Sequence, residues 1–198
     1  MVDDAKLKQA EIYYQKGLSF GQDGDADGAI ECWSKTVELN PKHFEGWYNL
    51  GNVYHMGKGD LEKAIECWKK ALELKPDDVD VLYNMGNAYR EFKEYDKAIE
   101  SYKKAVELAP NDHEAWNNMA NAYNGKGDKD QAVKCWKKAL EIKPDKYETW
   151  YNLGIAYKEL GEYDLGIKCC KKIQERYPDS YEVKRLLDAI IEDRESAT

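Results

Sequence analysis

Residues 47–54 read Trp-Tyr-Asn-Leu-Gly-Asn-Val-Tyr, and this octapeptide indicates the fold because its pattern returns along the whole chain. Four of its residues recur at the three- and four-residue spacing of one helix face: Trp47, Leu50, Gly51 and Tyr54. A second run follows with the same spacing: Ala64, Ile65, Trp68, Ala71 and Leu72. Two amphipathic helices are therefore predicted, one on each side of the sequence Gly-Lys-Gly-Asp at 57–60.

The helix pair repeats with a fixed period. The prolines that end the second helix of each pair are separated by 35, 34, 34 and 34 residues. A small residue recurs in register with Gly51, and an aromatic residue recurs in register with Tyr54. One pair of helices cannot bury its apolar face alone, so stacked pairs are expected to share one core. Five helix-turn-helix units in a single domain are predicted, at 10–43, 44–78, 79–112, 113–146 and 147–180.

Short polar turns separate the two helices of a unit. They read Gly-Lys-Gly-Asp at 57–60 and at 125–128, and Gly-Glu-Tyr-Asp at 161–164. Glycine permits the left-handed backbone that ends a helix, and the aspartate is expected to cap the next helix. The second unit has one residue more than the others, which is expected in this turn. Beyond Pro178, an apolar stripe predicts that 181–198 hold a C-terminal capping helix and tail.

The octapeptide, together with Ala64, Trp68, Ala71 and Pro76, resembles the tetratricopeptide repeat (TPR), whose period is 34 residues. The resemblance covers almost the whole chain. It implies an all-α fold, a right-handed α-solenoid of five TPR units with the capping helix at its end. It also implies a protein–protein interaction module or scaffold, and not an enzyme.

The composition restricts the class of protein. The chain has 198 residues, a formal net charge of −8 and 42% hydrophobic residues, which is too apolar for a disordered acidic chain. The acidic balance argues against a nucleic-acid partner. The sequence has no apolar run near the ~18 residues of a membrane span, and its start lacks the pattern of a secretory signal. A soluble, cytoplasmic protein is expected.

No motif for catalysis or metal binding stands out. The histidines His43, His55 and His113 lack a second histidine or a cysteine at helical metal spacing. Equivalent cysteines of successive units are expected ~8–10 Å apart, beyond the about 7 Å that a disulfide spans. They are therefore expected to be buried free thiols: Cys32, Cys67, Cys135 and Cys169. No catalytic residue, cofactor or metal site is predicted.

The resemblance places partner binding on a concave face, which the first helix of each unit lines. Tyrosine and asparagine recur there. The predicted ligand-binding residues are Tyr48, Asn49, Asn52, Tyr83, Asn84, Asn87, Arg90, Asn117, Asn118, Asn121, Tyr151, Asn152 and Lys158. Asparagine amides can bond the backbone of an extended peptide or helix without reading its sequence, and tyrosine adds flat contact area. The same asparagines could instead bond neighbouring helices.

Charged residues also recur in register. One position of every first helix is acidic: Glu11, Glu45, Asp80, Glu114 and Glu148. This row would repel a carboxylate, so neutral or basic segments are favoured as partners over acidic C-terminal tails. Pairs of lysines recur on the second helices and are expected to form a solvated outer face or to contact an acidic partner: Lys69-Lys70, Lys103-Lys104, Lys137-Lys138 and Lys171-Lys172.

Two other interpretations stay open. The chain could be a structural scaffold that self-associates into a homo-oligomer, because its outer units depart from the repeat pattern. It could also be an engineered, consensus-like repeat protein, because the units are nearly regular.

Overall fold

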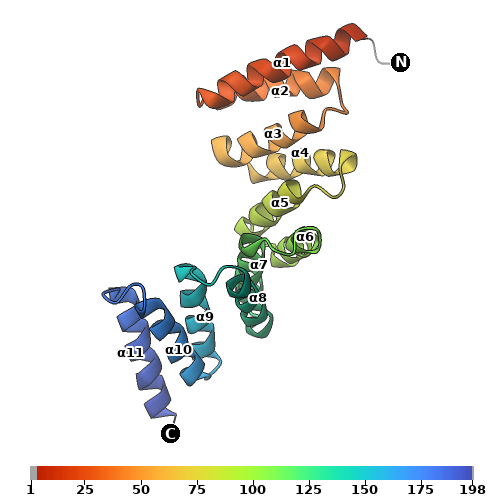
Figure 1. The fold of residues 1–198 in the computed structure, drawn as a ribbon. Helices are drawn as coiled ribbons and strands as arrows, with labels where there is room; N and C mark the ends of the chain where they lie inside the picture. The colour runs from red at the N-terminus through yellow and green to blue at the C-terminus, as the bar shows by residue number, and fades with distance from the viewer. Residues whose placement is uncertain (1–3, 198) are drawn as a thin grey trace. The chain divides into compact units, whose positions relative to one another are not determined.

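The computed structural model describes residues 4–197, and every regular element in that range is helical (Figure 1). The elements are α1 (Asp4–Gln22), α2 (Ala26–Leu39), α3 (Phe44–Asn52), η1 (Val53–Lys58), α4 (Leu61–Leu74), α5 (Val79–Glu91), α6 (Tyr95–Leu108), α7 (His113–Lys126), α8 (Lys129–Ile142), α9 (Tyr147–Glu159), α10 (Tyr163–Gln174) and α11 (Tyr181–Ser196). The fold is therefore all-α and consists of consecutive helix-turn-helix pairs, as the sequence predicts.

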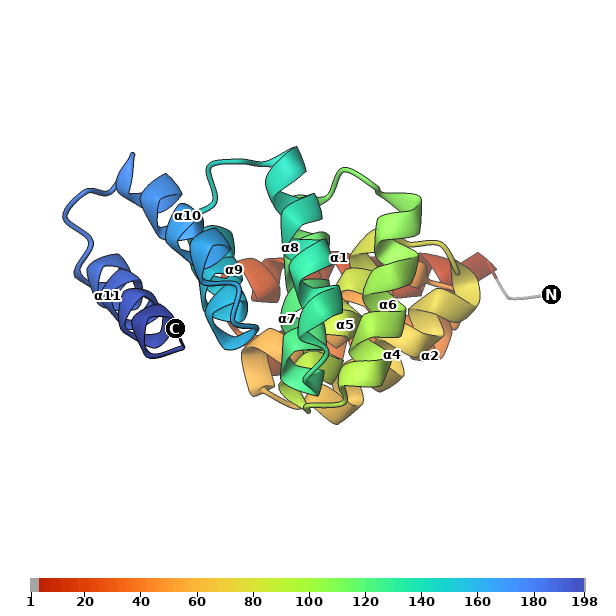
Figure 2. The ribbon, with the colours of Figure 1, turned by 90° about the horizontal axis from the view of Figure 1, so that it is seen from below.

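Contacts between helices divide the chain into two compact units, an N-terminal unit that ends at Phe92 and a C-terminal unit that begins at Lys93. In the N-terminal unit, each helix from α1 to α5 packs against the next helix in sequence. In the C-terminal unit, the same neighbour packing runs from α6 to α11. Figures 1 and 2 show the pairs α7–α8 and α9–α10 side by side within this second unit.

The close approach of paired helices depends on a glycine placed against a buried indole ring. A Cβ atom at Gly51 would lie 2.3 Å from Nε1 of Trp68, and one at Gly17 would lie 2.4 Å from Nε1 of Trp33. Trp68 is fully buried, and Trp33 is 6% exposed. The recurring small residue of the sequence is thus the space into which the tryptophan of the partner helix fits.

The turns inside the units confirm most of the predicted capping. Gly59 and Gly127 adopt positive φ angles of 66° and 92°, and the aspartates that follow them cap α4 and α8. The prediction for 161–164 is wrong in one respect, because Asp164 does not cap α10. Its carboxylate instead lies 3.1 Å from the Arg194 guanidinium of α11.

The additional residue of the second unit lies inside a helix, so its predicted place in the turn is wrong. Residues 53–58 form the π-helical segment η1, which continues directly from α3. A π-helical turn accommodates one residue more than an α-helical turn does. His55 stays packed, 3.1 Å from Glu91 and edge-on to Trp68, whereas the neighbouring Met56 is 86% exposed.

The last helix covers the apolar side of the helices before it. α11 packs against α9 and α10, and its apolar stripe is buried: Val183, Leu186 and Ile190. At the start of α11, the Ser180 hydroxyl accepts a hydrogen bond from the Val183 N–H. A short side chain that caps the first turn, followed by a buried stripe, is the pattern of an amphipathic surface helix.

Candidate functional site

All thirteen predicted ligand-binding residues are half-buried. Those of the N-terminal unit lie on α3 and α5, and those of the C-terminal unit lie on α7 and α9. A half-buried polar side chain is held by its neighbours and still reaches solvent. These residues are therefore neither core residues nor freely moving surface residues.

In the N-terminal unit, the Asn52 side chain is the centre of a hydrogen-bond network. Its carbonyl oxygen accepts a hydrogen bond from Trp68 Nε1 at 3.2 Å and another from Asn84 Nδ2 at 3.2 Å. Both lone pairs of that oxygen are thereby used, so the Asn52 amide N–H groups are what it offers to a ligand. Asn49 donates to the Tyr14 hydroxyl at 3.5 Å.

The C-terminal unit repeats this arrangement. The Asn121 carbonyl oxygen accepts from Trp136 Nε1 at 3.2 Å and from Asn152 Nδ2 at 3.5 Å. The Asn117 carbonyl oxygen accepts from the Thr149 hydroxyl at 3.0 Å. Several asparagines therefore bond neighbouring helices through one end of the amide. Nothing in the repeat spacing identifies the tryptophan N–H as the donor, so the sequence did not reveal this role.

Stacked aromatic pairs fix the positions of two predicted tyrosines. The Tyr48 ring lies parallel to Phe44, with centroids 6.1 Å apart and an interplanar angle of 7°. Tyr151 is stacked on Tyr147 with centroids 6.1 Å apart and an angle of 8°. A ring that is already ordered loses little rotamer freedom when it contacts a partner.

The two predicted cations differ in their surroundings. Lys158 Nζ lies 2.8 Å from Asp193 of α11, and this hydrogen bond raises the pKa of Lys158. The charge of Lys158 is thus already paired within the C-terminal unit. Within residues 4–197, Arg90 Nε is buried and has no hydrogen-bond partner. Asp193 is the residue that the sequence did not connect to this surface, because it lies on the last helix.

The acidic row is partly neutralised. Lys75 Nζ lies 3.3 Å from Glu45, and Lys146 Nζ lies 3.9 Å from Glu114. Burial raises the pKa of Glu45, but hydrogen bonds from its own backbone N–H and from Lys75 outweigh that effect and lower the pKa overall. Glu45 therefore stays ionised at neutral pH and keeps a negative charge at the edge of the predicted surface.

The lysine pairs of the second helices point to a solvated face. The second lysine of each pair bonds a glutamate three or four residues away, on its own helix or, for Glu175, at the helix end: Lys70 with Glu73, Lys104 with Glu100, Lys138 with Glu141, and Lys172 with Glu175. These groups are exposed, and pairs of this kind contribute little to stability.

The remaining reactive groups have structural roles. All five cysteines are buried, and burial raises the pKa of Cys67 to about 12. The His43 ring accepts a hydrogen bond from the Gly46 N–H and caps α3. Over residues 4–197, no cluster of three side chains suited to a metal ion is present. In the same range, none of the helices combines the length and the apolar character that a membrane span needs.

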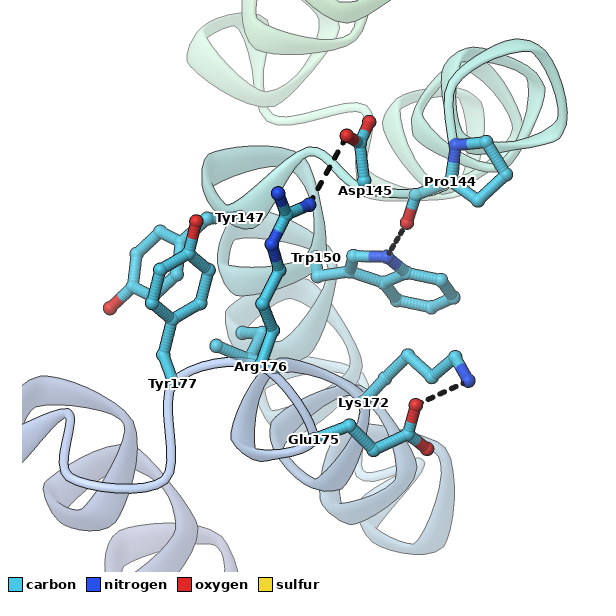
Figure 3. Close-up of a pocket in the computed structure, with 9 residues that line it drawn as sticks. Pro144, Asp145, Tyr147, Trp150, Lys172, Glu175, Arg176 and Tyr177 are labelled. Carbon is cyan, nitrogen blue, oxygen red and sulfur yellow. Dashed lines mark hydrogen bonds and ion pairs between the residues drawn. The ribbon is translucent and has the colours of Figure 1, made fainter.

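A pocket of about 390 Å³ lies where the turn before α9 meets the end of α10 (Figure 3). The Pro144 carbonyl oxygen accepts a hydrogen bond from Trp150 Nε1 at 2.7 Å, and the Arg176 guanidinium lies 3.2 Å from Asp145. None of the thirteen predicted residues lines this pocket. Its polar groups bond one another, so they hold the turn in place.

Comparison with known families identifies the repeat. A family model described as the TPR domain of cytochrome c-type biogenesis protein H matches residues 35–142, more than half of the chain. The chain belongs to the tetratricopeptide repeat family. Two further models described as tetratricopeptide repeats match residues 147–180 and 10–43.

Known proteins share the TPR fold at low sequence identity. The crystal structure of MamA protein is 29% identical, with a TM-score of 0.82, over 85% of this chain and 91% of that chain. YrrB, described as a TPR protein with an unusual peptide-binding site, is 22% identical with a TM-score of 0.78, over 87% and 89% of the two chains. A TPR protein from Parabacteroides merdae is 20% identical with a TM-score of 0.82, over 94% and 73%.

A curated relative matches a shorter segment. The uncharacterized protein MJ0572 of Methanocaldococcus jannaschii is 44% identical over 46 residues, which are 23% of this TPR chain and 54% of that protein. The chain thus spans about half the length of this relative.

Proposed function

We propose that the first helices of the repeats bind an extended or helical segment of a partner protein, without catalysis. The TPR fold indicates a protein–protein interaction scaffold, and TPR domains are typically non-enzymatic.

The observation that carries the proposal is the half-buried state of all thirteen residues, combined with the one-sided bonding of their amides. The bonds described for Asn52 and Asn121 within residues 4–197 all use the carbonyl oxygen of the amide. In each unit, the N–H groups of an amide held in this way suit the carbonyl oxygen of a peptide backbone. The stacked rings of Tyr48 and Tyr151 add ordered contact area beside them.

Electrostatics favours a neutral or basic partner. Glu45 stays ionised, and the ammonium of Lys158 is held by Asp193. An acidic C-terminal tail would meet the negative charge of Glu45, and the ammonium of Lys158 is already paired with Asp193. A segment with lysine or arginine would meet complementary charge.

The test is to measure the affinity of neutral, basic and acidic peptides for the full chain and its variants. We expect Asn84→Ala and Asn152→Ala, one in each unit, to weaken binding of the best neutral or basic peptide at least fivefold. The control is Lys69→Ala on the exposed face of α4, which should leave affinity unchanged. Equal affinity of all three variants would refute the proposed surface.

Self-association is a second candidate function, and two exposed tyrosines support it. Tyr177 and Tyr181 are 44% and 70% exposed and flank the turn before α11. Aromatic residues of this kind are enriched at protein interfaces. Light scattering over a concentration series would test it, because a strict monomer at high micromolar concentration excludes a homo-oligomeric scaffold.

A further inference from the structure

A second pocket, of about 290 Å³, lies inside the N-terminal unit beside η1. Its walls come from the end of α1, the turn that follows it, α2, α3 and η1. The lining residues include Gly21, Ala26, Trp33, Asn52, Met56 and Gly57. Three of these six residues are glycine or alanine, and two of the larger ones supply an indole ring and a thioether.

The C-terminal unit shows what fills the equivalent place there. Ala26 and Tyr95 occupy the same register position at the start of α2 and α6. In the C-terminal unit, the Tyr95 ring lies directly against Gly125, and its Cε1 would be 2.5 Å from a Cβ atom at that glycine. In the N-terminal unit, a Cβ atom at the corresponding Gly57 would meet no ring, only the methyl group of Ala26 at 3.1 Å and Cγ2 of Val53 at 3.2 Å. The exchange of a phenol ring for a methyl group leaves the pocket open.

The walls of the pocket have the chemistry that an aromatic side chain prefers. Trp33 is 6% exposed and offers ring carbons beside Gly21, where Cη2 would lie 3.3 Å from a Cβ atom. The flexible Met56 side chain is 86% exposed, and thioethers contact aromatic rings favourably. The N–H groups of Asn52 can donate to a hydroxyl oxygen.

The rim of the pocket is negatively charged. Asp23 and Asp25 flank Gly24, which lines the pocket, and Asp27 follows in the first turn of α2. Lys58 Nζ lies 2.6 Å from Asp27 and pairs with that carboxylate. Over residues 4–197, neither of the other two aspartates has an ion-pair partner, so a positive charge near the pocket mouth is favoured.

We infer that this pocket receives a tyrosine side chain of the partner, with a lysine or arginine next to it in the partner's sequence. The bound ring would take the place that Tyr95 takes in the C-terminal unit. This inference rests on the proposed function, since it specifies one side chain of the segment that the first helices bind.

The pocket is tested with p-cresol, the side-chain analogue of tyrosine, by NMR on the full chain. We expect saturable shifts of the Trp33 indole signals and the Met56 methyl signal. Ala26→Tyr fills the pocket from within and should weaken p-cresol binding at least tenfold. Leu61→Tyr places the same side chain at the same register position of the second repeat and should leave binding unchanged. Absence of shifts in the unmodified protein, or equal binding by Ala26→Tyr, would overturn the inference.

The charge requirement is tested with the capped tetrapeptides Gly-Tyr-Arg-Gly, Gly-Tyr-Glu-Gly and Gly-Ala-Arg-Gly. We expect the first to bind at least fivefold more tightly than either of the others. Asp23→Asn should reduce its advantage over the glutamate peptide, and high salt should do the same. Equal affinity of the arginine and glutamate peptides would overturn the charge argument. Self-association that Ala26→Tyr abolishes would assign the ring to a second copy and would overturn the partner assignment.

Failure here is distinguishable from failure of the proposed function. If p-cresol does not bind but Asn84→Ala still weakens peptide binding, the assignment of the pocket is wrong and the proposed binding surface on the first helices is retained. If p-cresol binds and Asn84→Ala has no effect on any peptide, the pocket is a separate site and the proposed surface is wrong.

Discussion

The second and fourth repeats form nearly the same helix pair from nearly the same sequence, yet one contains a π-helical segment and the other does not. Both have the turn Gly-Lys-Gly-Asp, at 57–60 and 125–128. Both place a tryptophan N–H on an asparagine oxygen at 3.2 Å. The second repeat has η1 after α3, whereas α7 continues as a regular helix through Lys126.

A repeat can accommodate an additional residue at the end of its first helix without a change in the turn that follows. In both repeats the lysine of the turn bonds the aspartate at the start of the preceding second helix, Lys58 with Asp27 and Lys126 with Asp96, each at 2.6 Å. The insertion is confined to η1, so the turn keeps its register with the neighbouring repeat. The local consequence is that Met56 lies exposed in solvent.

The largest effect is expected from removing the buried ring that both repeats share. Trp68→Ala and Trp136→Ala should each lower the free energy of unfolding by about 3–5 kcal/mol, because both rings are fully or almost fully buried. Urea unfolding followed by circular dichroism measures this. A cost for Trp68→Ala that differs by several kcal/mol from that for Trp136→Ala would break the equivalence of the two repeats.

The indole hydrogen bond offers the next test. Asn52→Leu and Asn121→Leu copy the first repeat, where Leu18 stands in that register and Trp33 Nε1 has no partner among the described residues. Each substitution should cost about 1–3 kcal/mol, since it strands a buried donor. Asn52→Leu should cost more, because Asn52 also accepts from Asn84 at 3.2 Å, whereas the equivalent bond to Asn121 is 3.5 Å.

The indole N–H signals in NMR spectra provide the matched measurement. Leu18→Asn should move the Trp33 indole signal toward those of Trp68 and Trp136 and slow its hydrogen exchange. An unchanged Trp33 signal would mean that the first repeat is packed differently from the others.

The fold was predictable from the sequence because its determinants are local and periodic. Helix-forming stripes and a proline after each second helix recur every 34 or 35 residues, and four of the five inner turns contain glycine. The five repeats share this pattern, so several independent sequence signals predict the same fold. The positions of the half-buried tyrosines and asparagines follow from the same period.

The details of the predicted binding surface were not predictable, because they depend on which atoms form hydrogen bonds with one another. A repeat position shows that Asn52 lies on the first helix, but it does not show that Trp68 uses its carbonyl oxygen. The pocket beside η1 depends on Ala26 standing opposite a glycine in the next repeat. The pairing of Lys158 with Asp193 depends on how the last helix docks.

The turn of the third repeat provides a smaller test of the comparison. Lys93 adopts φ of 60° at the register position where Gly59 and Gly127 stand, and a side chain is unfavourable there. Lys93→Gly should therefore raise the free energy of unfolding by about 1 kcal/mol. The control is Gly127→Lys, which should lower it by a similar amount. A loss of stability in Lys93→Gly would show that the lysine makes a compensating contact.

The smallest effect on stability, and the most direct test of the comparison, is expected from deleting Met56. The deletion makes the second repeat 34 residues long and gives it the same spacing between its aromatic residue and Gly-Lys-Gly-Asp as the fourth repeat. We expect a continuous α-helix from Phe44 to Lys58, visible in backbone carbon shifts, with the Lys58–Asp27 pair retained. Because Met56 is 86% exposed, the free energy of unfolding should change by less than about 0.5 kcal/mol.

An insertion into the fourth repeat shows whether η1 only accommodates the additional residue or is needed for the packing of the second repeat. Inserting methionine after Asn124 should create a π-helical segment in the fourth repeat, but there Tyr95 packs directly on Gly125. That insertion should therefore cost more than the deletion does, because the ring must move. If deleting Met56 instead lowers stability strongly or breaks the Lys58–Asp27 pair, then η1 is needed for docking against the first repeat. The two repeats would then be held by different contacts despite their shared turn sequence.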